Sequence, residues 1–106
     1  MNLPTVINSF INAQNNFDSE AYTECFTDNA IVYDEGKTHT GKDEIRAWNE
    51  ESTATYKAQM KPVDFAVNGE TATLKAEISG IFDVSPITLK FEIKDYKIAS
   101  LNIGNA

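Results

Sequence analysis

Few side chains in this sequence can do chemistry, and they occur singly rather than in clusters. The chain has one cysteine, Cys25, and one histidine, His39. One cysteine cannot form an internal disulfide, and these two residues cannot build a zinc site. We therefore expect neither a metal nor an organic cofactor. The remaining chemistry is general acid–base catalysis by a carboxylate, for which Asp34 is the best-placed candidate.

Asp34 ends a short segment, Ala30 to Asp34, that is typical of a β-strand. Its side chain shares a face with Val32, because side chains alternate along a strand. If that face is buried, desolvation raises the pKa of the carboxyl group and suits it to act as a general acid or base. The same position also suits an aspartate that caps the following loop at Glu35 and Gly36. Both interpretations stay open at this point.

The other candidate site residues are His39 and two aromatic residues, Trp48 and Tyr56. His39 lies between two threonines in a polar segment, Glu35 to Thr40, which predicts a loop and a solvated imidazole. The alternative is that His39 transfers protons near physiological pH. Trp48 predicts either a cavity wall with an indole N–H donor or an ordinary core residue. Tyr56 is a possible hydroxyl donor near the same helix.

The first half of the chain reads as three helices. Pro4 suits a first helical turn, and an apolar stripe runs from Leu3 to Gln14. A second, short helix begins at Asp18 or Ser19 and carries four inward candidates: Ala21, Tyr22, Cys25 and Phe26. The spacing of Thr40 and Asp43 predicts a capping box and a third helix from about Lys42 to Ser52.

The second half has the two-residue period of β-strands. Pro62 indicates an edge strand or a bulge, and Asn68-Gly69 predicts a hairpin. The next strand alternates an apolar face with a polar one, and the apolar residues are Ala72, Leu74, Ala76 and Ile78. Gly80 allows a bend, and further turns are predicted at 83–86 and at Asp95. We expect an α+β fold, in which three N-terminal helices pack on the concave face of a cone-shaped, curved antiparallel sheet.

Composition excludes several classes of protein. The chain has 106 residues, enough for one domain, and a net charge of −7. Without a cluster of Lys and Arg, binding to nucleic acid or to an anionic membrane is not expected. No apolar run approaches the ~20 residues of a membrane helix. The N-terminus lacks the pattern of a signal peptide, so we expect a cytoplasmic protein.

Two stretches resemble a known family. Residues 17–22 with 25–34 are similar to the SnoaL-like proteins of the nuclear transport factor 2-like superfamily, which includes the ketosteroid isomerases. Asn29 replaces the second aspartate of the family pattern. Residues 41–48 resemble the glycine-led third helix of these proteins. The resemblance implies one SnoaL-like domain over residues 1–106.

The resemblance narrows the set of reactions that this chain is expected to catalyse. The position of Asp34 matches the base of the isomerases, but Phe10 falls where their tyrosine donor would stand, and Leu89 falls near their protonated acid. The dehydratases need two histidines and the epoxide hydrolases an Asp–Arg–Asp cluster, whereas this chain has a single arginine, Arg46. The cyclases mainly need one pocket aspartate, which Asp34 supplies.

We therefore expect a homodimer with an internal apolar pocket for a small hydrophobic ligand, shaped by Phe10, Trp48 and Tyr56. Proton transfer on a small carbonyl compound, with Asp34 as the acid or base, is the expected chemistry. The alternative is a non-catalytic ligand-binding or dimerisation module. Its dimer interface would use the polar outer face of the sheet, which carries Thr73, Lys75, Glu77, Thr88, Lys90 and Glu92.

Overall fold

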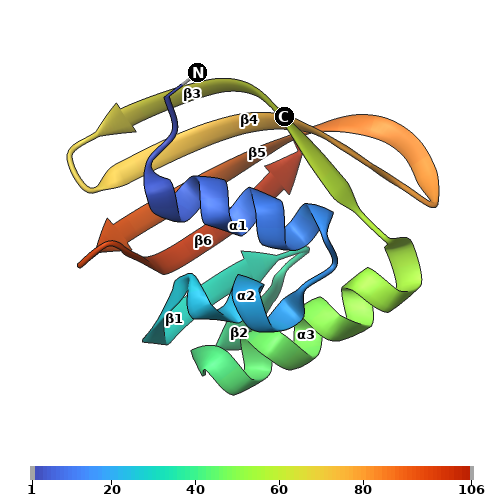
Figure 1. Ribbon diagram of the computed structural model, residues 1–106, viewed down its shortest axis with the longest axis horizontal. Coiled ribbons are helices and arrows are strands. Elements are labelled where there is room, and N and C mark those ends of the chain that lie inside the picture. The colour runs from blue at the N-terminus through green and yellow to red at the C-terminus, as the bar shows by residue number, and fades with distance from the viewer. Residues whose placement is uncertain (1, 106) are drawn as a thin grey trace.

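The computed structural model describes residues 2–105 and shows three helices on one face of a six-stranded sheet (Figure 1). In chain order the elements are α1 (Thr5–Asn15), α2 (Ser19–Glu24), β1 (Phe26–Asp34), β2 (Lys37–Thr40), α3 (Gly41–Tyr56), β3 (Gln59–Asn68), β4 (Thr71–Gly80), β5 (Phe82–Lys94) and β6 (Lys97–Asn105). The α+β class with a curved, unclosed sheet is confirmed.

The strand order across the sheet is β2-β1-β6-β5-β4-β3. All neighbouring strands are antiparallel except β1 and β6, which are parallel. The last strand thus enters the middle of the sheet and joins the β1–β2 hairpin to the long meander of β3, β4 and β5. This pairing brings residues from the two ends of the chain to the same part of the sheet.

The helices cover the inner face of the sheet, with α1 crossing its middle and α3 lying along β1 and β2 (Figure 1). Asp18 caps α2, because its carboxylate accepts a hydrogen bond of 3.1 Å from the Ala21 N–H. The predicted capping box of α3 differs in detail. The Thr40 side chain makes no cap bond, while the Glu44 carboxylate accepts from the Thr40 N–H at 2.9 Å.

Some predicted boundaries were wrong. The segment predicted as a loop from Glu35 to Thr40 contains β2, because its backbone pairs with β1 through a two-residue turn. Phe26 opens β1 instead of ending α2. Helix α3 extends beyond Ser52 to Tyr56, so Tyr56 ends a helix, and β3 begins three residues later at Gln59.

The edge-strand features are confirmed, and one predicted turn is not. β3 lies at an edge and its register shifts between Pro62 and Asp64. The residues at 83–86 continue β5 rather than forming a turn. Pro86 fits there because β6 pairs with β5 only from Ile87 onward, so its missing N–H costs no bond on that side. The chain reverses earlier, between Gly80 and Phe82.

Aromatic rings fill the space between α1, α2 and the sheet. Phe10 and Tyr22 lie 4.9 Å apart between ring centroids, and Phe10 meets Phe91 edge-on at 5.3 Å. Phe10, Phe26 and Phe91 are almost fully excluded from solvent. The apolar face predicted for β4 also packs here, with Ala72, Leu74 and Ala76 buried and Ile78 partly buried.

Within residues 2–105, no helix is long and apolar enough to cross a membrane.

Candidate functional site

Asp34 lies at the end of β1 on the face that the helices cover. Its neighbour on the same face, Val32, is fully buried, and Asp34 itself is partly buried. In the register of the sheet, Asp34 stands between Lys37 of β2 and Ile103 of β6. The carboxylate therefore closes a strand before a turn and lies on the same face of that strand as the buried Val32.

The surroundings of Asp34 raise the pKa of its carboxyl group. Burial is the largest cause, because a charged carboxylate loses solvation, and the nearby Glu35 charge adds to it. His39 acts in the opposite direction and lowers the pKa. A carboxyl group whose pKa is moved toward neutral pH is better suited to exchange protons than an ordinary surface aspartate.

His39 is placed differently from the sequence prediction. The imidazole belongs to β2, where His39 pairs with Val32 and faces inward, and it is partly buried. It stacks on the indole of Trp48 with ring centroids 4.9 Å apart and an interplanar angle of 21°. The alternation of Thr38, His39 and Thr40 was the available signal, but a four-residue polar strand is easily taken for a loop.

Trp48 and Tyr22 complete the surroundings. Trp48 projects from α3 and its ring centroid lies 6.3 Å from that of Tyr22, which comes from α2. Burial raises the pKa of the Tyr22 hydroxyl, and the charge of Asp34 raises it further. Tyr22 therefore lies within electrostatic reach of Asp34. We call Tyr22, Asp34, His39 and Trp48 the Asp34 cluster; its members come from α2, β1, β2 and α3.

The remaining predicted site residues lie in two different places. Phe10 stands behind the Asp34 cluster, because its fully buried ring packs on Tyr22. Tyr56 ends α3, and 50% of its surface is exposed. Its ring meets Phe82 edge-on at 6.2 Å, near the β4–β5 corner. Tyr56 is about 12 Å further along the helix axis than Trp48, at 1.5 Å per residue.

Two surface hollows lie elsewhere. One, of about 630 Å³, is an open polar groove between the end of α1, the start of α2 and the second half of α3, and Arg46, Glu50 and Lys57 contribute to its lining. The other, of about 430 Å³, lies beside the β3–β4 and β5–β6 turns. Asp34, His39 and Trp48 line neither hollow. Residues 2–105 contain no group of three side chains placed to hold a metal ion.

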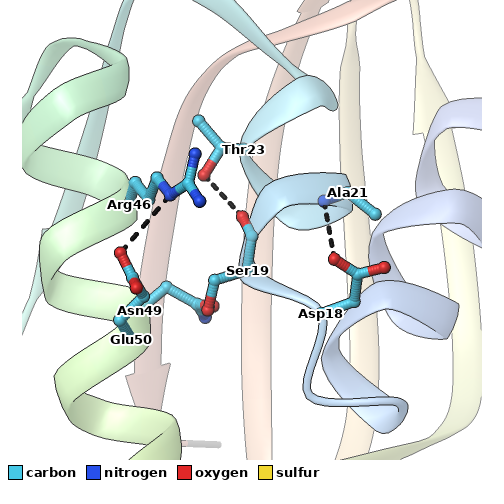
Figure 2. A network of polar contacts seen from close by, with 7 residues as sticks. All are labelled: Asp18, Ser19, Ala21, Thr23, Arg46, Asn49 and Glu50. Atoms are coloured by element: carbon cyan, nitrogen blue, oxygen red, sulfur yellow. Dashed lines mark hydrogen bonds and ion pairs between the residues drawn. The ribbon is translucent and has the colours of Figure 1, made fainter.

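A polar network fixes the helices that flank the groove (Figure 2). The Ser19 hydroxyl donates to the Asn49 side-chain oxygen at 2.7 Å. The Asn49 side-chain amide in turn donates to the Gln14 side-chain oxygen at 3.1 Å. At the surface, Arg46 pairs with Glu50 at 3.4 Å. Asn49 and Gln14 are buried, and their amides join α3 to α1 and, through Ser19, to α2. This network holds α3, and with it Trp48, against the helices that carry Tyr22 and Phe10.

The fold and the site define a class of small α+β proteins. In this class a curved sheet carries three helices on its inner face, and here a partly buried aspartate ends the first strand. The model of the SnoaL-like domain matches residues 7–100. The chain therefore belongs to the SnoaL-like family, as its motifs predict. No match to a curated protein is found.

Solved structures support the same assignment. The chain is 33% identical to a proposed polyketide cyclase from Sinorhizobium meliloti, with a TM-score of 0.92 over 96% of this chain and 95% of that chain. A ketosteroid isomerase-like protein from Catenulispora acidiphila, solved with trimethylamine, is 17% identical with a TM-score of 0.92 over 99% and 88%. A cystatin-fold protein from Novosphingobium aromaticivorans is 16% identical with a TM-score of 0.84 over 99% of both chains. The last two show the fold alone.

Proposed function

We propose that the protein binds a small hydrophobic carbonyl compound at the Asp34 cluster and catalyses proton transfer, with Asp34 as the general acid or base. One observation carries the proposal: a partly buried carboxylate stands on the covered face of the sheet with its pKa raised by that burial. The likeness to a proposed polyketide cyclase supports the class of reaction.

The chemistry needs a base beside an apolar surface. Asp34 removes a proton from the carbon next to a carbonyl group, and burial strengthens it as a base. Trp48 supplies a wall for the apolar part of the ligand, and Phe10 supports that wall from behind through Tyr22. We leave Tyr56 out of this proposal, because its ring packs on Phe82 at the other end of α3.

The test is α-proton exchange on small ketones. Cyclohexanone, 1-indanone and acetylacetone are incubated with the protein in deuterated buffer, and the loss of the α-proton signal is followed by NMR. We expect the wild-type chain to accelerate exchange for at least one probe, and Asp34→Asn to lower that rate by about 10²-fold or more, which is a typical contribution of one acid–base group.

Asp28→Asn is the matched control, because the Asp28 side chain is 94% exposed on the same strand and only touches Lys42 across 3.8 Å. It should exchange at the wild-type rate. Equal rates for Asp34→Asn and the wild type, or no acceleration of any probe by the wild type, would contradict the acid–base role.

A second candidate function is a non-catalytic module that binds ligands or dimerises through the outer face of the sheet. The observation in its favour is a polar face that lies opposite the helices. Thr73 pairs there with Lys90, and Lys75 pairs with Thr88. Such a face offers hydrogen-bonding and charged groups of both signs for a two-fold interface. We propose a homodimer of this kind, which is compatible with catalysis on the inner face.

A further inference from the structure

We propose that His39 is the second proton-transferring group of the site, which donates a proton to the carbonyl oxygen of the ligand while Asp34 takes one from the adjacent carbon. The inference rests on the proposed function of Asp34 and adds to it an assigned proton donor and a ligand class. That class is a small ketone or diketone whose carbon and oxygen are both reached from one face of the β1–β2 hairpin.

The register of the hairpin places the two groups correctly. His39 pairs with Val32, and Asp34 pairs with Lys37, so Asp34 and His39 are diagonal neighbours on adjacent strands. Diagonal neighbours have their backbones ~7–8 Å apart and their Cβ atoms somewhat closer. Two side chains at this separation can approach different atoms of one small ligand. They also influence each other, because His39 lowers the pKa of the Asp34 carboxyl group.

Trp48 holds the imidazole in place. The two rings are nearly parallel at 21° and their centroids are 4.9 Å apart, so the stack restricts the plane of the His39 ring. Trp48 thus acts as a positioning residue for His39, in addition to forming a wall. Both His39 and Trp48 are only partly buried, so part of the stacked pair stays accessible.

The proton transfers balance as an enolisation. The Asp34 carboxylate takes the proton from the carbon next to the carbonyl group, and the electron pair of that C–H bond becomes the new C=C bond. The C=O π electrons move to the oxygen, which takes a proton from the His39 imidazolium. The products are an enol, a neutral carboxylic acid and a neutral imidazole. Return of a proton from Asp34 to a carbon, and of the enol proton to His39, restores both groups.

The step needs an ionised Asp34 together with a protonated His39, so the exchange rate should fall on both sides of a pH optimum. The alkaline limb of that profile is the one that needs the His39 proton. Other titratable groups near the pair are Glu35 in the turn, Lys37 at the start of β2, Glu44 on α3, Tyr22 on α2 and Cys25 directly after α2.

The test compares His39→Gln and His39→Phe with the wild type in the exchange assay. His39→Phe keeps an aromatic ring on Trp48 and removes the proton donor, so loss of rate cannot be attributed to loss of the stack. We expect both variants to exchange about 10²-fold more slowly and to lose the alkaline limb. Thr38→Gln is the control, because Thr38 is the exposed, outward neighbour of His39, and it should retain the wild-type rate and profile.

Two readouts do not depend on turnover. Carbon NMR titration of the Asp34 carboxyl group should give a higher pKa in His39→Gln than in the wild type, because a neighbouring positive charge is removed. Trp48 is the only tryptophan, so its fluorescence should change with the charge of His39 in the wild type and stay level with pH in both variants.

The outcomes separate the two proposals. If Asp34→Asn loses exchange while His39→Gln and His39→Phe retain the wild-type rate, the role of His39 is wrong and the role of Asp34 stands. If Asp34→Asn retains the rate, the proposed function fails and the role of His39 fails with it. An Asp34 pKa that is the same with and without His39, or tryptophan emission in the wild type that does not respond to pH, also overturns the pairing.

Discussion

At the scale of single residues, Asp34 illustrates the conflict between function and stability. A carboxylate that is desolvated in the folded protein keeps its charge at a cost. The cost falls on the ionised form, which is the form a general base needs. Folding alone does not require a carboxylate here, because a neutral amide of the same size would fit the site without the penalty.

This conflict predicts a pH-dependent gain in stability for Asp34→Asn. Because the folded-state pKa of Asp34 is raised, the folded protein holds this proton more tightly than the unfolded chain, whose aspartate titrates near 3.9. The favourable contribution of the neutral acid is complete below that unfolded pKa and is lost as the pH rises through the folded pKa. At pH 7 the variant should therefore be more stable than the wild type.

Urea unfolding at pH 7 and near pH 3.5 measures the effect. The advantage of Asp34→Asn should be present at the higher pH and should shrink at the lower one. Asp28→Asn removes a surface carboxylate and should show little difference at either pH. A variant that is less stable than the wild type at pH 7 would mean that the ionised Asp34 carboxylate is stabilised by its surroundings.

At the scale of the elements, the corner between β4 and β5 depends on a close contact with the end of α3. A Cβ atom on Gly80 would stand 2.4 Å from the Tyr56 carbonyl oxygen and 2.9 Å from the Phe82 ring. The Ile81 N–H donates to that same Tyr56 carbonyl at 2.9 Å. The corner and the helix are thus joined through backbone atoms, which cannot move aside as a flexible side chain can.

Gly80→Ala should therefore destabilise the fold by about 1–3 kcal/mol, the usual cost of forcing extra volume into a packed site. Gly104→Ala is the matched control, since a Cβ there would meet nothing within 4 Å, and its effect should stay within about 0.5 kcal/mol. Denaturant unfolding of both variants measures the difference. Similar free energies of unfolding for the two variants would mean that the corner can relax away from α3.

At the scale of the whole molecule, the sheet divides two proposed roles between its faces. The inner face carries the Asp34 cluster beneath the helices. On the outer face, the strand registers align Thr73, Lys90, Asn102 and Tyr33 in one row across β4, β5, β6 and β1. The row continues from Tyr33 to Thr38 of β2. Tyr33 is 42% exposed and gives the row an aromatic side chain that can anchor a partner. A second copy of the chain is the partner that we propose.

Sedimentation equilibrium tests this dimer. The wild type should sediment as a dimer, and Lys90→Glu should shift the equilibrium toward monomer, because Lys90 stands inside the row and the chain is already strongly acidic. Lys37→Glu changes the net charge equally but lies at the start of β2, opposite Asp34 and outside the row, and it should leave the dimer intact. A wild-type monomer at all concentrations would rule out this role for the outer face.

The local and periodic features of the protein can be predicted from its amino-acid sequence. The helical stripe of α1, the cap at Asp18, the hairpin after Asn68 and the bulge after Pro62 follow from patterns within a few residues. The family motifs in the first half determined the fold class. The alternation of Val32 and Asp34 was enough to place the carboxylate on one face of its strand.

Which face of the strand Asp34 occupies, and which side chains surround it there, depend on contacts between elements that are distant in the sequence. β2 is a strand because β1 supplies its hydrogen-bonding partner. The sequence of a four-residue polar segment does not indicate that partner. The same pairing turns His39 inward, where its ring stacks on Trp48 of the next helix, α3. The Tyr56 ring packs on Phe82 because α3 continues past its predicted end. These are contacts between distant elements, and their energies depend on packing that no local pattern contains.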